Sequence, residues 1–139
     1  LMAIDRFDGL KQWFLEHMKM AGEAIHAKAS EKYSDIVAKA RNYMEDNFRK
    51  DISLDDVSRV ANVSPYYFSK VFKDETGETF VEYLTKLRIA YAKKLLREKE
   101  KSIKQICLES GYSDPNYFSR IFKKSVGVTP SEFQKEGME

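Results

Sequence analysis

The stretch YFSKVFK, residues 67–73, returns as YFSRIFK at residues 117–123, and both exchanges within it keep the chemical type. The correspondence continues downstream at the same offset of 50 and upstream at an offset of 49. The further pairs are Gly77 with Gly127, Thr79 with Thr129, Glu82 with Glu132, Tyr83 with Phe133, Leu54 with Ile103, Val57 with Ile106 and Ser64 with Ser113. The chain therefore holds two copies of one structural unit.

Capping residues mark where helices are expected to start. All three prolines follow a side chain that can accept a hydrogen bond from a helix N–H, and proline is well tolerated at the first helical position. These pairs are Ser64-Pro65, Asp114-Pro115 and Thr129-Pro130. The capping-box spacing marks starts at Ser53 with Asp56, Thr79 with Glu82, Ser102 with Gln105 and again Thr129 with Glu132.

Apolar residues recur at helical spacing after these starts, and no run alternates for long enough to predict a strand. The longest of these apolar stripes comprises Phe80, Tyr83, Leu84, Leu87, Ala90, Tyr91 and Leu95. We therefore expect an all-α fold, with two helix-turn-helix subdomains joined by a long linker helix and preceded by an N-terminal helical segment. The expected bounds are 1–33 for a helical linker or signalling segment from an upstream domain and 34–139 for the domain itself. Within it, the first subdomain covers about 53–76, the linker helix about 80–98 and the second subdomain about 102–126.

The turn inside each unit carries a residue that tolerates positive φ. Asn62 stands there in the first copy and Gly111 in the second, and these two residue types adopt left-handed backbone most readily. A short helix, a tight turn and a longer capped helix are typical of the helix-turn-helix. The second helix of that motif enters the major groove of DNA.

The candidate DNA-binding face consists of the polar positions opposite the apolar stripe of each second helix. Arginine can bind guanine bidentately, asparagine can pair with adenine, and lysine can contact guanine or phosphate. Helix N-termini at Ser64 and Ser113 offer further N–H groups to phosphates. Ser69 and Ser119 also fit a simpler role as small packing residues. The predicted face comprises Tyr66, Ser69, Lys70 and Lys73 in the first copy and Asn116, Ser119, Arg120, Lys123 and Lys124 in the second.

The charge of the chain is uneven. The net charge is only +2 over 139 residues, but residues 84–126 carry 11 basic and 4 acidic side chains. A basic middle on an otherwise acidic chain favours a polyanionic partner, although a lysine-rich solvated helix face would give the same count. The single cysteine excludes an internal disulfide and favours a reducing cytoplasm. The apolar runs are too short to span a membrane, so we expect no membrane contact.

Residues that could carry other chemistry do not form a site in the sequence. His17 and His26 are nine positions apart, with no ligand cluster around them, and Cys107 lies in an apolar stripe as an inert core thiol. The pairs Asp55-Asp56 and Asp74-Glu75 fit helix ends better than acid–base catalysis. No phosphate-binding glycine loop or nucleophile motif occurs. We therefore expect no enzyme, no metal and no cofactor.

The second copy from Ile103 to Phe133 resembles the signature of the AraC family of bacterial transcription regulators, and the resemblance covers about residues 34–136. It implies that two recognition helices read adjacent major grooves of double-stranded DNA. Carried over by position, the base-reading residues would be Tyr66, Ser69, Lys70, Asn116 and Arg120.

Two residues depart from the family pattern. Cys107 stands where alanine is usual, and Gln134 stands where arginine is usual. We expect both departures to be structural or peripheral.

Two further stretches are similar to the AraC-type output domains of two-component response regulators. They are Ile52-Ser53-Leu54 and residues 80–88. This similarity implies an upstream receiver or sensor. We separately expect RNA polymerase as a partner of a transcription regulator. A stripe near heptad spacing would serve dimerisation or pack on its own domain; it comprises Phe7, Leu10, Phe14, Met18, Ala21 and Ile25.

Two functions fit these faces. The first is sequence-specific DNA binding, and the alternative is a helical protein-interaction module that docks a partner protein on the same faces.

If the domain binds DNA, the length of the linker helix has a geometric consequence. A linker helix over 80–98 would be about 28 Å long, whereas adjacent major-groove sites are about 34 Å apart. We therefore expect either that the DNA bends or that one recognition helix docks shallowly.

Overall fold

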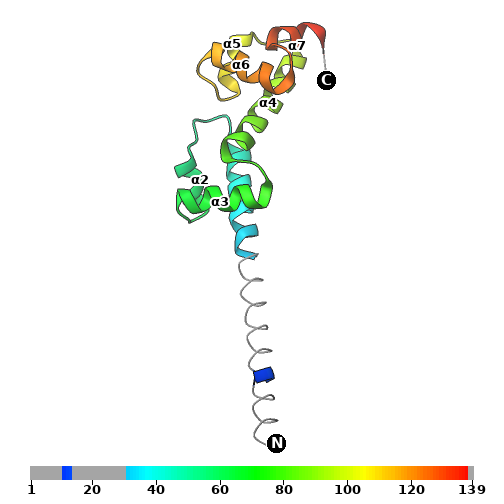
Figure 1. Cartoon of the computed structure of the whole chain (residues 1–139). Helices are drawn as coiled ribbons and strands as arrows, with labels where there is room; N and C mark the ends of the chain where they lie inside the picture. The colour runs from blue at the N-terminus through cyan, green and yellow to red at the C-terminus, as the bar shows by residue number, and fades with distance from the viewer. Residues whose placement is uncertain (1–10, 14–30, 138–139) are drawn as a thin grey trace, which may run out of the picture. The chain divides into compact units, whose positions relative to one another are not determined.

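The structure is a computed structural model that describes residues 11–13 and 31–137 (Figure 1). Residues 31–47 are helical, and the chain divides into two compact units between Asp35 and Ile36. The predicted stripe over residues 7–25 and both histidines lie outside the described residues. Among the residues that are described, no helix is long and apolar enough to cross a membrane.

The second unit, residues 36–139, contains two helix-turn-helix subdomains joined by one helix. The first subdomain has α2 (Leu54–Val60) and α3 (Pro65–Thr76), and the linker helix is α4 (Phe80–Glu98). The second has α5 (Ile103–Glu109), α6 (Pro115–Val126) and α7 (Pro130–Glu136). Helix α4 packs on α3 near its start and on α5 and α7 further along (Figure 1). The all-α prediction with a long linker helix is confirmed.

The predicted caps begin the labelled helices. Ser53, Thr79 and Ser102 each form a complete capping box with the residue three positions on. The hydroxyls of Ser64 and Thr129 each accept one N–H from the first turn of the helix that follows. Together these bonds satisfy N–H groups that would otherwise lack a partner at the helix starts.

The helix start predicted at Asp114-Pro115 is confirmed, whereas Ser113, which we also expected at the N-terminus of this helix, does not cap it. Asp114, not Ser113, caps α6, because its carboxylate accepts from the N–H of Asn116. Three residues separate Gly111 from Pro115, whereas two separate Asn62 from Pro65. The second turn is thus one residue longer, which shifts the cap and changes the offset between the copies from 49 to 50.

The two tight turns use the left-handed backbone that their sequence predicted. Asn62 has a φ of 61° and Gly111 has a φ of 101°. Each residue lets the chain reverse directly after a short helix, α2 or α5. The second helix of each unit can then pack across the first.

The repeat extends to the aromatic packing in each core. Phe72 meets Tyr83 edge to face at 5.6 Å and 76°, and Phe122 meets Phe133 at 5.6 Å and 76°. Such edge-to-face pairs add to the burial of the rings. Each recognition helix is therefore held by the same clamp, whose second ring comes from the following helix, α4 or α7.

The predicted apolar stripe of the linker helix was partly wrong. Ala90 is exposed, while Ile89, Ala92 and Leu96 are buried in the core of the second subdomain. Leu84 is buried near the first turn of the helix. Because α4 serves a different core at each end, its buried stripe changes face along the helix, and a single period does not describe it.

Candidate nucleic-acid interface

The predicted face of α3 is exposed because the opposite face fills the first core. Phe68, Val71 and Phe72 are buried, which turns Ser69 and Lys70 outward. Tyr66 is 83% exposed, and Ser69 and Lys70 are exposed beside it. Because the Tyr66 ring is large and exposed to solvent, it is available for contact with a partner surface. The cap of this helix, Ser64, carries no charge.

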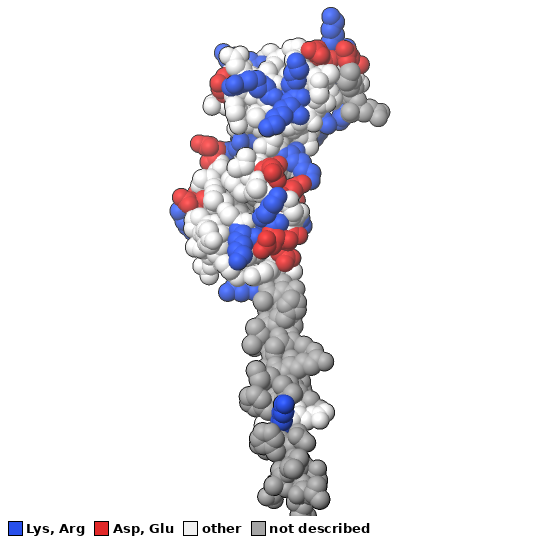
Figure 2. Space-filling model, viewed as in Figure 1, with Lys and Arg blue, Asp and Glu red and all other residues white. Residues whose placement is uncertain are grey.

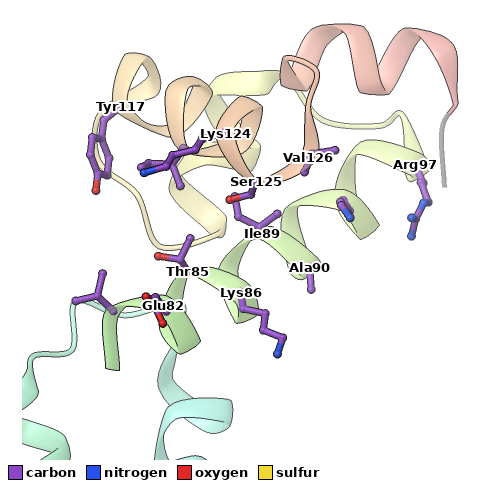
Figure 3. Close-up of a pocket in the computed structure, with 13 residues that line it drawn as sticks. Glu82, Thr85, Lys86, Ile89, Ala90, Arg97, Tyr117, Lys124, Ser125 and Val126 are labelled. Carbon is purple, nitrogen blue, oxygen red and sulfur yellow. The ribbon is translucent and has the colours of Figure 1, made fainter. Parts of the chain in front are cut away.

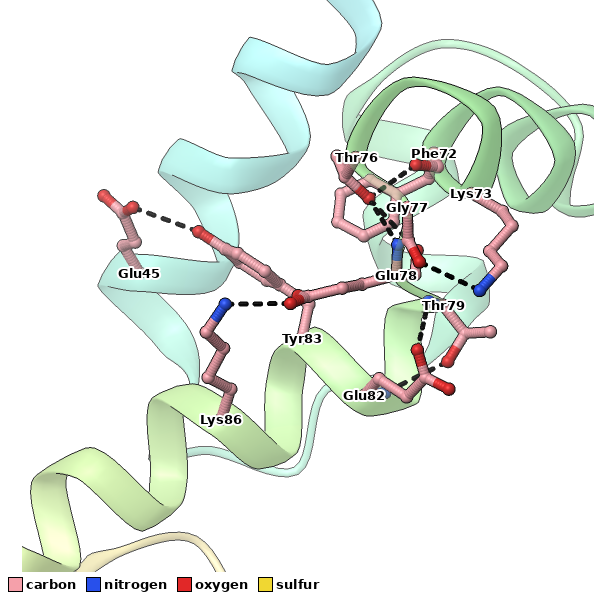
Figure 4. Close-up of polar contacts among 10 residues, drawn as sticks. All are labelled: Glu45, Phe72, Lys73, Thr76, Gly77, Glu78, Thr79, Glu82, Tyr83 and Lys86. Atoms are coloured by element: carbon pink, nitrogen blue, oxygen red, sulfur yellow. Dashed lines mark hydrogen bonds and ion pairs between the residues drawn. The ribbon is translucent and has the colours of Figure 1, made fainter. Parts of the chain in front are cut away.

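Lys73, the fourth predicted residue on α3, is engaged at the end of its own helix. Its Nζ donates to the carbonyl oxygen of Gly77 at 2.9 Å, as Figure 4 shows. A cation at a helix C-terminus interacts favourably with the helix dipole. Lys73 is exposed, but its ammonium group already has a partner within the molecule.

Two exposed polar contacts made by α4 lie near the C-terminus of α3, one to the helix over residues 31–47 and one to the loop between α3 and α4 (Figure 4). The Tyr83 hydroxyl donates to Glu45 Oε1 at 3.2 Å, and Lys86 Nζ pairs with Glu78 Oε1 at 2.8 Å. Partial burial raises the pKa of Tyr83, and the nearby Glu45 charge raises it further. The raised pKa keeps the Tyr83 hydroxyl a donor to Glu45, and this bond joins α4 to the helix over residues 31–47.

The face of α6 repeats that of α3 with stronger donors. Asn116, Arg120 and Lys123 are exposed, and Ser119 is half-buried. The guanidinium of Arg120 lies 6.0 Å from the centre of the Tyr117 ring, close to the limit for a cation–π contact. The packing role considered for the two serines therefore fits Ser119 better than Ser69. Asn116 and Arg120 are one helical turn apart and offer donors on the same face.

The N-terminus of α6 differs from that of α3 in charge. The Oδ1 atom of Asp114 accepts from the N–H of Asn116 at 3.0 Å, so a carboxylate occupies the position where Ser64 places a neutral hydroxyl in α3. A phosphate approaching the start of α6 would meet that negative charge. The prediction of a phosphate contact at this helix start is therefore weakened by the corrected cap.

A groove between α4 and α6 is lined by basic side chains, and the sequence predictions missed those that α4 contributes. It has a volume of about 690 Å³ and an apolar floor that includes Ile89 and Ile121. Lys124 of α6 lines the groove (Figure 3), whereas Arg120 does not belong to its lining. The lysines and arginine that α4 adds to the lining are Lys86, Lys93 and Arg97. The basic excess of residues 84–126 was the signal that could have found them.

Charge is distributed differently over the two subdomains. Figure 2 shows basic side chains across the visible face of the second subdomain, with acidic ones toward its edges. On the first subdomain the two signs are intermixed in the same view. The second subdomain is therefore the stronger attractor for a polyanion.

The other residues considered for chemistry have structural positions. The Cys107 thiol is buried and donates to the Tyr112 carbonyl at 3.5 Å, and burial raises its pKa. Asp56 belongs to the capping box with Ser53. Gln134 Nε2 donates to the Lys101 carbonyl at 3.3 Å and so ties α7 to the start of the second subdomain. No group of three potential metal ligands occurs within residues 11–13 and 31–137.

Two helix-turn-helix units with matching exposed faces, held on one helix, define a double helix-turn-helix DNA-binding domain. A family model described as a helix-turn-helix domain matches residues 57–136. The chain belongs to the AraC family of bacterial transcription regulators.

Similar proteins include regulators and response-regulator domains. The C-terminal domain of AraT, a response regulator from Geobacillus stearothermophilus, has 39% identity and a TM-score of 0.71, covering 75% of this chain and 87% of that one. The transcriptional regulatory protein YesN of Bacillus subtilis is 43% identical over 76 residues, covering 53% of this chain and 21% of YesN. The regulator YtdP of the same species is 30% identical over 132 residues, covering 95% of this chain and 17% of YtdP. The chain thus spans about a fifth of the length of these two Bacillus relatives.

Proposed function

We propose that residues 36–137 form a sequence-specific DNA-binding domain that regulates transcription by placing α3 and α6 in adjacent major grooves. The observation that supports this most strongly is the duplicated aromatic clamp. Phe72 with Tyr83 and Phe122 with Phe133 hold the two helices in the same way. Each clamp leaves the polar side of its helix exposed, with Ser119 more buried than the equivalent Ser69. Two such groove-reading faces on one chain suit a single duplex.

The proposed base-reading residues are those with donors or a large ring at the exposed centre of each helix. Arg120 would bind guanine and Asn116 adenine in the second groove. Tyr66, Ser69 and Lys70 would read the first groove, where the ring can contact a thymine methyl group. The other predicted residues on α3 and α6 would contact phosphates and would set affinity rather than specificity. These residues are Lys73, Ser119, Lys123 and Lys124.

The experiment that tests this function is selection of bound duplexes from a random DNA pool, followed by a salt titration on the selected site. If four or more phosphates are contacted, affinity should fall roughly a hundredfold between 50 and 200 mM salt. A protein-interaction module would select no sequence. Failure to enrich any motif would overturn the proposal and favour the protein-docking alternative.

We also propose that the domain is the output part of a longer cytoplasmic regulator of the two-component type. The resemblance to response-regulator output domains and the helix over residues 31–47 support an upstream partner domain. Such a regulator would contact RNA polymerase and dimerise through its upstream region. It would work without a cofactor and without catalysing a reaction. Sedimentation of the chain alone and with its upstream region would test the dimer.

A further inference from the structure

Arg88 bonds from the middle of α4 to the first subdomain. Its Nε donates to the carbonyl oxygen of Phe48 at 2.8 Å, and its Nη2 donates to the carbonyl oxygen of Lys50 at 2.9 Å. These carbonyls follow the helix that ends at residue 47 and precede α2. The planar guanidinium fork holds two acceptors in a fixed geometry.

The same guanidinium lies against the turn of the second subdomain. Its Cζ is 5.3 Å from the centre of the Tyr112 ring. A Cβ atom added to Gly111 would stand only 2.8 Å from both Arg88 Nε and the Phe48 oxygen. Arg88 therefore occupies a tight space between residues 48–50, which precede α2, and the turn between α5 and α6.

A second set of contacts joins the same two segments. Arg49 Nε donates to the carbonyl of Glu109 at 2.9 Å, and its guanidinium lies 4.8 Å from the Tyr91 ring. Phe48 meets that ring edge to face at 5.5 Å. Glu109 is held in turn by Lys101, whose Nζ is 2.7 Å from Oε1.

These contacts change how the two recognition helices are connected. If α4 were the only connection, the two subdomains could rotate relative to each other about that helix. The contacts of residues 48–50 add a second attachment, which directly precedes α2 and reaches the end of α5. Two attachments restrict rotation of one helix-turn-helix subdomain relative to the other far more than one attachment does.

We propose that Arg88 is a positioning residue that fixes the separation of α3 and α6 and thereby selects the spacing between the two DNA half-sites. This inference rests on the proposed function, because spacing matters only if both helices read one duplex. A rigid pair binds best when the half-sites match its own separation and loses the second contact when they do not. A loosened pair tolerates several spacings.

The test compares Arg88→Gln with a matched control on the same helix. Lys94→Gln removes one positive charge from an exposed position of α4. Binding is measured on duplexes in which the selected half-sites are moved apart or together by up to three base pairs. We expect wild type and Lys94→Gln to prefer one spacing at least tenfold, and Arg88→Gln to discriminate less than threefold. Arg88→Lys, which keeps the charge but not the fork, should fall between them.

A second measurement does not depend on DNA. Spin labels on Asp74→Cys in α3 and Ser125→Cys in α6 report the distance between the two helices, and buried Cys107 stays unlabelled. We expect a narrow distribution with Arg88 present and a distribution at least twice as wide in Arg88→Gln. Circular dichroism and thermal unfolding confirm that the variant is folded.

The outcomes separate the two proposals. Unchanged spacing preference together with an unchanged distance distribution in folded Arg88→Gln would overturn the positioning role. A wild-type chain that binds no duplex overturns the DNA-binding function, whatever the spin labels report. A broadened distribution with unchanged spacing preference also overturns the inference, because α3 and α6 would then adjust to the DNA.

Discussion

Arg88 Nε lies 2.8 Å from the place where a Cβ atom would stand on Gly111. This glycine thus meets two requirements at once. Its φ of 101° is unfavourable for any side chain, and the space that a side chain would need is filled by Arg88 and the Phe48 carbonyl. Gly127 has nearly the same φ, 98°, but nothing lies within 4 Å of its Cβ position. A side chain at Gly127 would therefore meet backbone strain alone, whereas a side chain at Gly111 would meet both strain and steric crowding.

Replacing each of these glycines by alanine should cost different amounts. We expect Gly127→Ala to lower the free energy of unfolding by about 1–3 kcal/mol through backbone strain alone. Gly111→Ala should cost about 1–3 kcal/mol more, because the methyl group displaces Arg88 or the Phe48 carbonyl. Urea unfolding followed by circular dichroism measures both. Equal losses would show that the crowding at Gly111 is relieved without cost.

Local features of the fold were predictable because they are encoded within a few residues. The capping boxes begin at Ser53, Thr79 and Ser102, and their partners lie three positions away. The positive φ at Asn62 and Gly111 follows from residue type in a short turn. The second turn has one extra residue, so the copies align at an offset of 49 before it and 50 after it. Aligning Ser113 with Ser64 at the offset of 49 therefore placed one cap a residue too early, before Asp114.

Features that depend on distant residues were not predictable from the pattern. The buried stripe of α4 includes Ile89 and Ala92 in place of Ala90, because the second core lies on another side of the helix than the first. Arg88 is one of 11 basic residues in the segment 84–126, and the sequence pattern does not distinguish it from the others. Its acceptors are 40 and 38 positions away in the chain, so periodicity carries no signal for them.

The capping box at Ser53 should make stability depend on pH. The backbone N–H of Ser53 donates to Asp56 Oδ2 at 2.9 Å, and the Ser53 hydroxyl accepts from the Asp56 N–H at 3.1 Å. Hydrogen bonding to Ser53 lowers the pKa of the Asp56 carboxyl. A lowered folded pKa gives stability that is present above the unfolded pKa of about 3.9 and is lost as pH falls through the folded value. The stability difference between wild type and Asp56→Asn should therefore be constant above about pH 5 and shrink below about pH 3.9. Urea unfolding from pH 7 to pH 2 measures it, and a constant difference throughout would contradict the assignment.

The carboxylate cap of α6 should weaken DNA binding while stabilising the helix. Asp114→Ser keeps a capping oxygen and removes the charge, so we expect little change in stability and a gain in affinity of a few-fold, about 0.3–1 kcal/mol. Asp114→Ala should lose about 1 kcal/mol of stability. The reciprocal change, Ser64→Asp in α3, should weaken binding by a similar factor. Fluorescence anisotropy with the selected duplex measures affinity, and no difference between Asp114 and serine would place this helix start away from phosphate.

Arg120 and Lys123 should differ in the kind of binding energy that they supply. Arg120→Ala should cost about 1–3 kcal/mol on the selected site and relax the preference at one base pair. Lys123→Ala should weaken binding to all sequences alike and reduce the salt slope by about 0.9. Arg120→Lys keeps the charge and loses bidentate geometry, so it should resemble the alanine variant in specificity. Equal loss on every sequence for Arg120→Ala would reassign this residue to phosphate.

The length of α4 predicts that the bound DNA bends. The 19 residues of α4 correspond to about 28 Å at 1.5 Å per residue, whereas adjacent major-groove sites on one face of straight DNA are about 34 Å apart. If the contacts of Arg88 keep the two subdomains from separating, the duplex must curve for both recognition helices to dock fully. The cost of bending would be repaid by the contacts of the second helix.

Circular-permutation gels measure this bend. The mobility of the complex should depend on where the site lies in the fragment, and the dependence should weaken in Arg88→Gln, because looser subdomains can follow straighter DNA. Lys94→Gln should behave as wild type. Uniform mobility with both half-sites protected from cleavage would mean that straight DNA accommodates both helices. The separation of α3 and α6 would then already match the repeat of the double helix without deformation.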